Sequence, residues 1–361
     1  MYFLPHTVTG GAYVSAIMIS LSMMGRGILP IRSFSFLASF VVLSSSAIEA
    51  AGFSPGSSSS SLSSSSSTTQ CAASSSDIHF GSTMSPSIQV QVIPNEKLFV
   101  SEPNPRWFGN GDNDSHNPTW TNSNWLKSRF HFSFAEYHSA ANTHFGSLRV
   151  MNDDLVQPER GFGTHPHQNM EIITYIVHGQ LTHQDSMGTK ESLGRGSIQF
   201  MTAGTGVRHS EFNHGDTPLR FIQTWIEPSQ RGLPPNYGSC TGSPTERRNQ
   251  WQHLVSNVKD PATKTPVEIN QDIDGYVTEL DLGKKVTFEL SQGRQAYLLC
   301  IEGSILINGN HKLSKYDACE ITSHGTLEIE ATEVEQTETG NVAHILMFVM
   351  KEVPGSGRKD I

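Results

Sequence analysis

Short apolar runs separated by turn-forming residues constrain the fold of this chain more than any other feature. From about residue 88 onward, runs of four to eight residues rich in β-branched and aromatic side chains alternate with glycine, asparagine, aspartate and proline. The clearest runs are "SIQVQVI", "FGSLRVM", "MEIITYIV", "SIQFM" and "LRFIQTWI". Such runs are typical of β-strands, and no sustained helical periodicity accompanies them. The sequence therefore predicts an all-β sandwich or barrel.

A weaker second copy of this pattern predicts two β domains of one type. The stretch "MEIITYIVHGQLTHQ" ahead of "SLGRGSIQFMTAG" can be aligned with "RQAYLLCIEGSILINGN" ahead of "KLSKYDACEITSHG". Each copy has an apolar strand, a turn at Gly179 or Gly303, a second strand, a polar connection and a further strand. We expect one domain at residues 88–235 and the other at residues 265–352.

A polar segment at residues 236–264 separates the two expected domains, and residues 353–361 form a short tail. Pro234, Pro235 and Pro244 mark the start of this connection, because proline ends regular elements. Within the connection, "TERRNQWQHLVSNV" is a candidate for a helix.

Residues 1–87 differ in kind from the rest of the chain. The stretch "MGRGILPIRSFSFLASFVVLSSSAIEAAGFSP" has basic, apolar and small residues in the order of a secretory signal, and its apolar core is too short to span a bilayer. A serine tract follows and is expected to be a disordered linker. We expect entry into a secretory route and no stable membrane span after processing. The "AAGFSP" stretch also resembles plastid presequences of algae with secondary plastids, whereas a later start codon would leave the protein cytoplasmic.

Charge and cysteine content argue against nucleic-acid binding and against a cysteine-based zinc site. The net charge is -9 and basic residues form no run, which argues against direct binding of nucleic acid. The four cysteines show no CxxC spacing, so we interpret them as buried or incidental thiols and not as a zinc site.

Two short motifs carry the candidate metal-binding residues. "THPHQ" contains His165 and His167, and "RHSEF" contains His209 and Glu211. Each pair alone is weak, because 16 histidines in 361 residues give roughly 0.7 His-x-His pairs by chance. On a strand, however, residues i and i+2 project from one face, so two neighbouring strands can direct all four side chains at one point. Pro166 cannot donate to a sheet ladder and places the first pair at a strand end or edge.

This donor set suits a first-row transition metal. Three imidazoles and one carboxylate can hold iron, nickel, copper or manganese and leave coordination positions free for a substrate or dioxygen. A structural zinc site is normally closed and uses thiolates, which this stretch lacks. The alternative is that these histidines are ordinary core or surface residues.

The motifs and their surroundings resemble the pirin family of the cupin superfamily, and closely its bacterial quercetinase-type members. The resemblance is carried by "WLKSRFHFSFAEY", "FGSLRVMNDD", "NDDLVQPERGFGTHPHQNMEIITYIVHGQLTHQDSMG" and "GSIQFMTAGTGVRHSEFN". It extends over residues 90–350 and is densest over residues 125–230. It implies a bicupin, with two jelly-roll (double-stranded β-helix) barrels and one metal site, in the N-terminal barrel.

The resemblance also implies the role of individual residues. The family's four metal ligands fall on His165, His167, His209 and Glu211, and the usual metal is Fe2+, with Ni, Cu, Mn, Co and Zn left open. Glu171 stands where many other cupins place a glutamate ligand, but pirins take the carboxylate from the second motif. We therefore leave Glu171 out of the ligand set and expect it to contact a ligand.

Residues near the motifs have plainer interpretations. Phe162, Met201 and Trp225 are candidates for lining a pocket, although an aromatic residue or methionine near a barrel mouth more often serves packing alone. We expect His183 and Asp185 to make structural hydrogen bonds. We expect glycines 204 and 206 of "TAGTG" to serve tight turns and not anion binding.

Two functions follow from the resemblance. The first is a quercetin 2,3-dioxygenase-type enzyme (flavonol 2,4-dioxygenase), in which the metal holds a flavonol or related phenolic substrate beside O2 and Glu211 is also the catalytic base. The second is a non-catalytic iron-binding pirin that acts as a redox-sensitive regulatory module and binds a protein partner. An unrelated phenolic substrate is a further alternative. We expect a monomer in either case.

Overall fold

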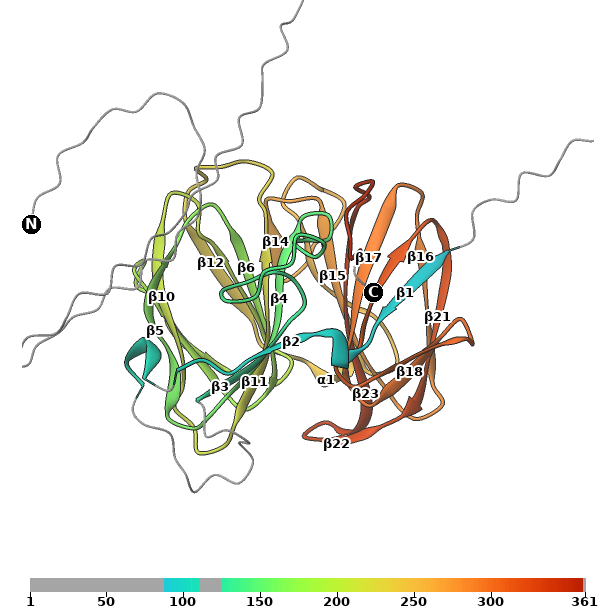
Figure 1. Cartoon of the computed structure of the whole chain (residues 1–361), viewed down its shortest axis with the longest axis horizontal. Helices are drawn as coiled ribbons and strands as arrows, with labels where there is room; N and C mark the ends of the chain where they lie inside the picture. The colour runs from blue at the N-terminus through green and yellow to red at the C-terminus, as the bar shows by residue number, and fades with distance from the viewer. Residues whose placement is uncertain (1–87, 105, 111–124, 360–361) are drawn as a thin grey trace, which may run out of the picture. The chain divides into compact units, whose positions relative to one another are not determined.

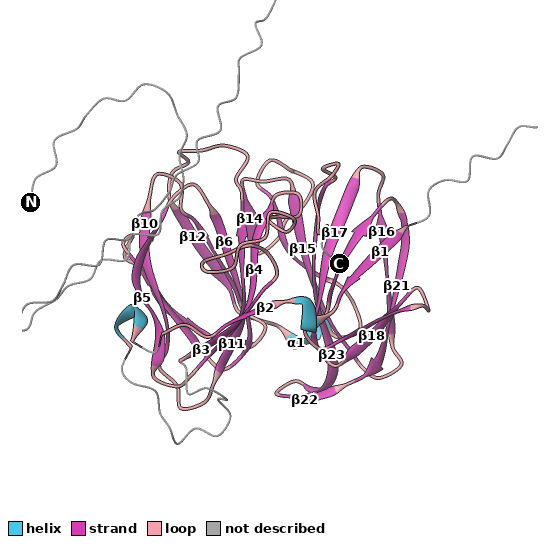
Figure 2. Ribbon diagram, in the orientation of Figure 1, coloured by secondary structure: helices cyan, strands magenta, loops and turns pink. Residues whose placement is uncertain are grey.

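The computed structural model describes residues 88–104, 106–110 and 125–359. The targeting signal and disordered linker predicted for residues 1–87 lie outside this described part. Strands dominate what is described (Figure 2), and this confirms the all-β prediction. No helix among these residues is long and apolar enough to cross a membrane.

The first barrel consists of two sheets. Its seven-stranded sheet has the order β12 (Asn236–Cys240), β9 (Ile198–Thr202), β6 (Glu171–His178), β11 (Leu219–Ile226), β4 (Leu148–Val156), β3 (Leu126–Phe130) and β2 (Phe99–Ser101). Its four-stranded sheet has the order β5 (Arg160–His167), β10 (Val207–Asn213), β7 (Leu181–Asp185) and β8 (Lys190–Leu193).

The second barrel repeats this plan, as the internal repeat predicted. Its large sheet has the order β1 (Gln89–Ile93), β20 (Ala318–Thr322), β17 (Arg294–Glu302), β23 (Gly340–Lys351), β15 (Ile273–Leu280), β13 (Gln252–Asn257) and β14 (Val267–Ile269), and β22 (Glu335–Thr337) pairs with β23. Its four-stranded sheet has the order β16 (Lys285–Leu290), β21 (Gly325–Glu333), β18 (Ser304–Ile307) and β19 (His311–Ser314). The bicupin architecture is therefore present.

The large sheets are buried on both faces, which explains their continuous apolar sequences. Seven of the eight residues of β6 are buried, although alternation would be expected of a sheet with one face in water. One apolar cluster joins strands of both large sheets, among them Tyr175 and Ile222 of the first barrel and Tyr297 and Phe348 of the second. The two barrels therefore share a core in addition to their own interiors.

The sheet pairings differ from the sequence-based division at three places. Strand β1 lies within the range assigned to the first domain, but it pairs with β20 of the second barrel. Figure 1 shows β1, in cyan, beside the orange strands of that barrel. The connection at residues 236–264 is also not a separate segment, because β12 pairs with β9 and β13 pairs with β15. It adds one strand to each barrel.

The helix considered for "TERRNQWQHLVSNV" is reduced to one turn. Helix α1 covers only Pro244–Arg247, and the later part of the segment forms β13. Leu254 and Val255 of β13 are buried in the core between the barrels, and burial of these side chains overrides the local helical preference. Two 3-10 turns complete the helical content of the described residues, η1 at Asn95–Lys97 and η2 at Trp107–Gly109.

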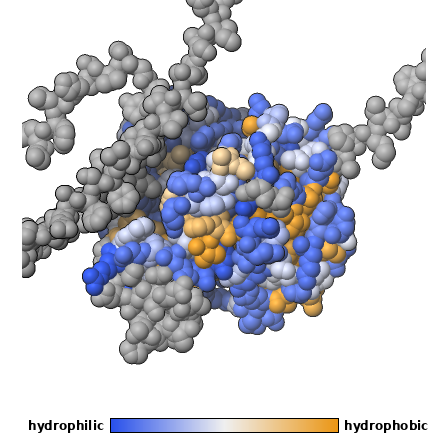
Figure 3. Space-filling model, viewed as in Figure 1, coloured by the Kyte–Doolittle hydropathy of each residue, from blue (hydrophilic) through white to orange (hydrophobic). Residues whose placement is uncertain are grey.

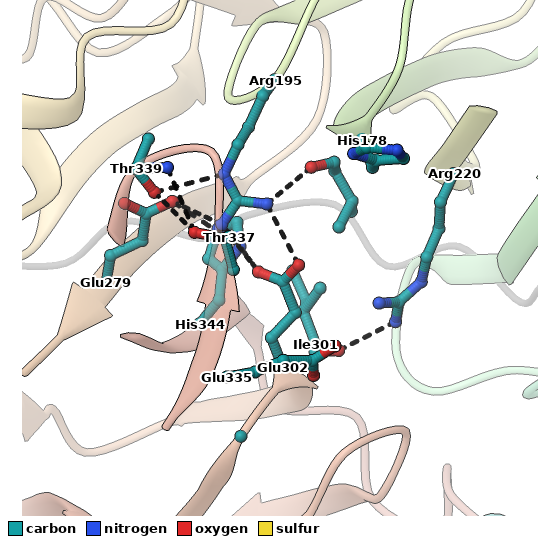
Figure 4. Close-up of polar contacts among 12 residues, drawn as sticks. His178, Arg195, Arg220, Glu279, Ile301, Glu302, Glu335, Thr337, Thr339 and His344 are labelled. Atoms are coloured by element: carbon teal, nitrogen blue, oxygen red, sulfur yellow. Dashed lines mark hydrogen bonds and ion pairs between the residues drawn. The ribbon is translucent and has the colours of Figure 1, made fainter. Parts of the chain in front are cut away.

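Buried charges also connect the barrels (Figure 4). Arg195 follows β8 and donates hydrogen bonds to both carboxylate oxygens of Glu302, at 3.0 and 2.7 Å, and to Glu279 at 2.9 Å. His344 of β23 contacts Glu302 at 3.0 Å and the hydroxyl of Tyr175 at 2.9 Å. Both oxygens of Glu302 therefore have hydrogen-bond partners, whereas Oε2 of Glu279 is buried and has none among the described residues.

The face shown in Figure 3 is mainly hydrophilic, with hydrophobic residues gathered in separate patches. The large hydrophobic side chains that are exposed are scattered along the described chain, and they are Val100, Trp107, Phe108, Met187, Val258, Leu282 and Val353. Single exposed apolar residues of this kind are normal on a protein surface.

Candidate metal centre

The register of β5 against β10 brings three histidines together. The two strands are antiparallel, and His165 lies directly opposite His209. His167 is two residues from His165 and projects from the same face of β5. The ring centroids are 4.6 Å apart for His165 and His209, 4.7 Å for His167 and His209, and 4.8 Å for His165 and His167. Ligand nitrogens of all three lie within 4.8 Å of one another.

The position of β5 explains Pro166. Strand β5 is at the edge of its sheet and ends at His167. A proline is tolerated there because an edge strand need not donate every backbone N–H. The His-x-His pair therefore lies at the end of an edge strand, as the sequence predicted.

Burial keeps the three imidazoles neutral. It lowers the pKa of His165, lowers that of His167 to about 3, and lowers that of His209 well below the ordinary value. The Nδ1–H of His165 donates to the carbonyl oxygen of Gly163 at 2.7 Å, which leaves the lone pair on Nε2. Neutral imidazoles with a fixed tautomer are the form in which histidine binds metals.

The nitrogens of His209 test whether a metal fits this site. Both are buried, and neither has a hydrogen-bond partner among the described residues. A buried polar atom without a partner is destabilising, and few remain in folded proteins. A cation between the three rings would supply the missing partner, so the residues present fit a metal ion.

Glu211 is close to His209 on β10, but its other neighbour among the candidate ligands is His183 and not His165 or His167. A bulge between His209 and Glu211 shifts the register against β5, and Glu211 pairs with His183 of β7. Ligand atoms of His183, His209 and Glu211 lie within 4.8 Å of one another. The four predicted ligands thus fall into two groups of three that share His209, with His183 as an additional member.

Three side-chain donors hold the Glu211 carboxylate. Its Oε1 accepts hydrogen bonds from Thr174 at 3.0 Å and Gln199 at 2.9 Å. Its Oε2 accepts one from Gln223 at 2.7 Å. Oε2 therefore has the freer lone pair and is the oxygen better placed to face a cation.

Comparison with known proteins agrees with these features. Residues 114–226 match the Pirin family, and residues 254–339 match the quercetinase C-terminal cupin domain. Quercetin 2,3-dioxygenase of Escherichia coli (strain K12) is 37% identical over 215 residues, which are 58% of this chain and 88% of the relative. A pirin-like protein of Caulobacter vibrioides is 38% identical over 209 residues, 58% of this chain and 89% of that protein.

This chain belongs to the pirin family. Among solved structures, Escherichia coli YhhW matches this pirin with a TM-score of 0.59 and 29% identity, over 73% of this chain and 99% of YhhW. A second structure, described as the bacterial pirin YhhW in complex with nickel(II), matches with the same TM-score and 28% identity, over 73% of this chain and 100% of that chain.

Aromatic side chains surround the histidines of this pirin. Trp225 meets His167 edge to face, with ring centroids 4.8 Å apart, and Phe162 lies 6.4 Å from His165. Both therefore lie beside the histidines, and Phe162 also packs against an apolar cluster that includes Trp125 and Phe221. Met201 is buried in a small apolar cluster with Ile172 and Val207, so it packs behind the site.

Within the part of the chain that the structure describes, Glu171 is hydrogen-bonded to Asn270 and not to a candidate ligand. Its carboxylate accepts hydrogen bonds from the backbone N–H of Asn270 at 2.9 Å and from the Asn270 side chain at 3.1 Å. Our expectation that Glu171 supports a ligand is therefore wrong. It faces the other way on β6 and attaches the first barrel to the segment before β15.

The structure gives Gly204 and His183 clear local contacts. Gly204 has φ +43°, and a Cβ there would lie 1.9 Å from the carbonyl oxygen of Leu233, so this glycine serves a tight turn. Gly206 also has a positive φ, +138°. His183 hydrogen-bonds Asp185 at 3.2 Å, as expected. The sequence did not reveal that His183 also joins the ligand cluster, although the i, i+2 spacing of His183 and Asp185 was a signal for it.

A turn between β2 and β3 contacts the site, and sequence patterns did not indicate it. In η2, Phe108 lies 5.5 Å from the ring of His165 and has φ +56°. Asn110 fixes this turn, because its side chain both donates to and accepts from the backbone of Gly161, at 2.9 and 3.1 Å. The turn is therefore attached to the strand that carries His165 and His167.

The interior of the second barrel is apolar. Its two sheets contribute a cluster that includes Val286, Ile305, Leu327 and Ile329. Among the described residues, both groups that could hold a metal lie in the first barrel. The two domains thus share a fold but differ in what fills them.

Proposed function

We propose that this pirin is a metal-dependent dioxygenase of the quercetinase type. It would open the heterocycle of a flavonol, or of a related phenolic compound, with O2 and release carbon monoxide and a depside. The main observation behind this proposal is the meeting of three neutral imidazoles whose nitrogens include two without partners. The relatives named quercetin 2,3-dioxygenase support the choice of reaction.

The metal would be held by His165, His167, His209 and Glu211. When bound, it supplies Lewis acidity and the capacity to bring a phenolate and O2 together. We propose Fe2+, while the same donors also suit Ni, Cu, Mn, Co or Zn. The nickel(II) complex of YhhW is an example of such an alternative in a related protein.

Glu211 is the proposed catalytic base. Among the described residues, Oε2 accepts a hydrogen bond from Gln223 alone, so its second lone pair, which would otherwise face the cation, is the one that can accept the proton of the substrate hydroxyl. Gln199 and Thr174 hold Oε1 and prevent the carboxylate from turning away. Holding the base in this orientation lowers the entropic part of the activation barrier.

Aromatic residues near the histidines suit a flat substrate. Phe108, Phe162 and Trp225 present ring edges or faces beside His165 and His167. Such surfaces stack well with aromatic ligands and exclude water from the reacting groups. Phe108 belongs to η2, so displacement of this turn is expected to weaken substrate binding.

Turnover of quercetin tests the proposal. The purified chain is loaded separately with each candidate metal and mixed with quercetin in air, and loss of the visible absorption and release of carbon monoxide are measured. We expect turnover with at least one metal, and none after His165 and His167 are both replaced by alanine. If none of the metals supports turnover, the proposed dioxygenase activity is contradicted, and the alternative of a redox-sensitive binding module is favoured.

A further inference from the structure

His183 is not among the four ligands proposed above, but its surroundings are those of a metal-binding histidine. It lies on β7 opposite Glu211, and its side chain is 1% exposed. Its Nδ1 is buried and has no hydrogen-bond partner among the described residues. A ring nitrogen of His183 lies within 4.8 Å of ligand atoms of both His209 and Glu211.

The contact with Asp185 prepares His183 to bind a cation. The Asp185 Oδ2 lies 3.2 Å from Nε2 of His183, so Nε2 carries the proton and donates it. The lone pair of the ring is then on Nδ1, the nitrogen without a partner. A carboxylate that fixes the tautomer of a histidine from behind is a common arrangement around metal ligands.

The orientation of Asp185 is itself fixed. Its Oδ1 accepts hydrogen bonds from the backbone N–H groups of Met187 at 2.8 Å and Thr189 at 3.0 Å. These bonds assign one carboxylate oxygen to the β7–β8 turn and the other to His183. Tyr237 stacks on the other side of the imidazole, with ring centroids 4.5 Å apart, and limits its rotation.

We propose that His183, His209 and Glu211 form an inner position for a divalent first-row cation, which shares His209 and Glu211 with the ligand set proposed above. Two imidazoles and a carboxylate are a sufficient ligand set for such an ion. This inference deepens the proposed metal site and rests on the same metal chemistry. All three ligands are buried, with 1–2% of each residue exposed, whereas His165 and His167 are partly exposed. The inner position is therefore shielded from water, and the outer position is open to a substrate.

A double variant separates the two positions. Replacing His165 and His167 by alanine removes two of the three outer histidines and leaves the inner group complete. We expect this variant to bind about one cobalt(II) or zinc(II) ion per chain in equilibrium dialysis. Adding His183→Gln should lower that affinity by at least about tenfold. The inference is overturned if the folded double variant binds no metal, or if His183→Gln leaves its affinity unchanged.

Asp185→Asn tests the same inference with almost no change in shape. The two backbone N–H groups keep the amide oxygen on their side, so the amide NH2 would face Nε2 of His183. Nε2 must then accept a hydrogen bond, and the proton moves to Nδ1, which can no longer bind a cation. In the double variant, we expect Asp185→Asn to lower metal affinity as His183→Gln does. Unchanged affinity in a folded protein would contradict the inner position.

His178→Gln is the matched control. His178 is on β6 of the same barrel, its side chain is 47% exposed, and it pairs with Glu338 on the surface. This change should leave metal binding as it is. The outcomes also separate this inference from the proposed enzyme, because wild-type protein that binds metal without turnover contradicts only the latter. Loss of metal from the double variant contradicts only the inner position.

Discussion

The five candidate ligands differ in their hydrogen bonds, and these bonds determine what each ligand can do. His165 and His183 each have one ring nitrogen bonded to an acceptor, which fixes the other as a lone-pair donor. His209 has no such bond on either nitrogen. Glu211 is held by three neutral donors. Residues that hydrogen-bond to these ligands are therefore expected to affect metal affinity, although they do not contact the metal themselves.

Gln199→Met is predicted to weaken metal binding. Gln199 donates to Oε1 of Glu211 at 2.9 Å and accepts from the hydroxyl of Tyr237 at 3.1 Å, so methionine would leave the carboxylate with one donor fewer. We expect affinity for cobalt(II) to fall about 10- to 100-fold in a competition titration. Gln184→Met, at an exposed position of β7, is the control and should have no effect. Equal affinity in both variants would show that this hydrogen bond is unimportant.

His131 is predicted to reduce stability in acid. It is buried and contacts the hydroxyl of Tyr297 at 2.9 Å, and burial lowers its pKa to about 4. Arg358 and Arg129 lower the pKa further, while Asp153 raises it. Below the ordinary value of 6.5, the unfolded chain binds a proton that the folded protein does not, so stability falls between pH 6.5 and 4.

His131→Gln should remove this contribution. The wild type is expected to lose about 2 kcal/mol more unfolding free energy than the variant between pH 7 and pH 4.5, since each pKa unit corresponds to about 1.4 kcal/mol. Urea unfolding of metal-free protein at the two pH values measures the difference. Parallel losses in the two proteins would argue against a neutral buried His131.

At the scale of strands, two-residue periodicity was enough to predict which histidines lie together. It placed His165 with His167 and His209 with Glu211, and the structure pairs their strands. It did not predict the bulge after His209, which depends on the pairing partner and not on local sequence. The pairing of β1 with β20 was also out of reach, because strands distant in sequence are joined only by tertiary packing.

The turn between β9 and β10 gives a prediction about backbone geometry. In Gly204→Ala, the new Cβ would meet the carbonyl oxygen of Leu233 at 1.9 Å, so the turn before His209 must move. We expect a loss of about 3 kcal/mol or more in unfolding free energy. Gly283→Ala has a similar positive φ, +71°, but nothing within 4 Å, and should cost only about 1 kcal/mol. Equal losses would contradict the steric explanation.

At the scale of the whole molecule, the two barrels are built as one unit. They share an apolar core, and β1, which the sequence assigned to the first domain, pairs with β20 of the second barrel. The cluster of buried charges around Arg195 in Figure 4 also joins them. Continuous apolar strands such as β6 were visible in the sequence, but their second buried face could not be assigned without the partner sheet.

Arg195→Met is predicted to destabilise both barrels together. It would leave the buried carboxylate of Glu302 without its guanidinium partner, which costs about 3–5 kcal/mol, whereas Glu279 keeps Arg247 at 3.1 Å. We expect a single unfolding transition at a lower temperature in calorimetry. Lys312→Met removes a surface pair with Glu333 and should change stability by less than about 1 kcal/mol. Separate transitions for the two barrels in the wild type would contradict the shared core.

His209 belongs to both proposed cation positions, so it gives the most direct test of the metal centre. Crystals of the zinc-loaded protein, measured at the zinc absorption edge, would locate the ion by its anomalous signal. We predict a peak about 2.1 Å from a ring nitrogen of His209, with its other ligands among His165, His167, His183 and Glu211. A zinc-loaded crystal with no peak within bonding distance of His209 would contradict the metal centre.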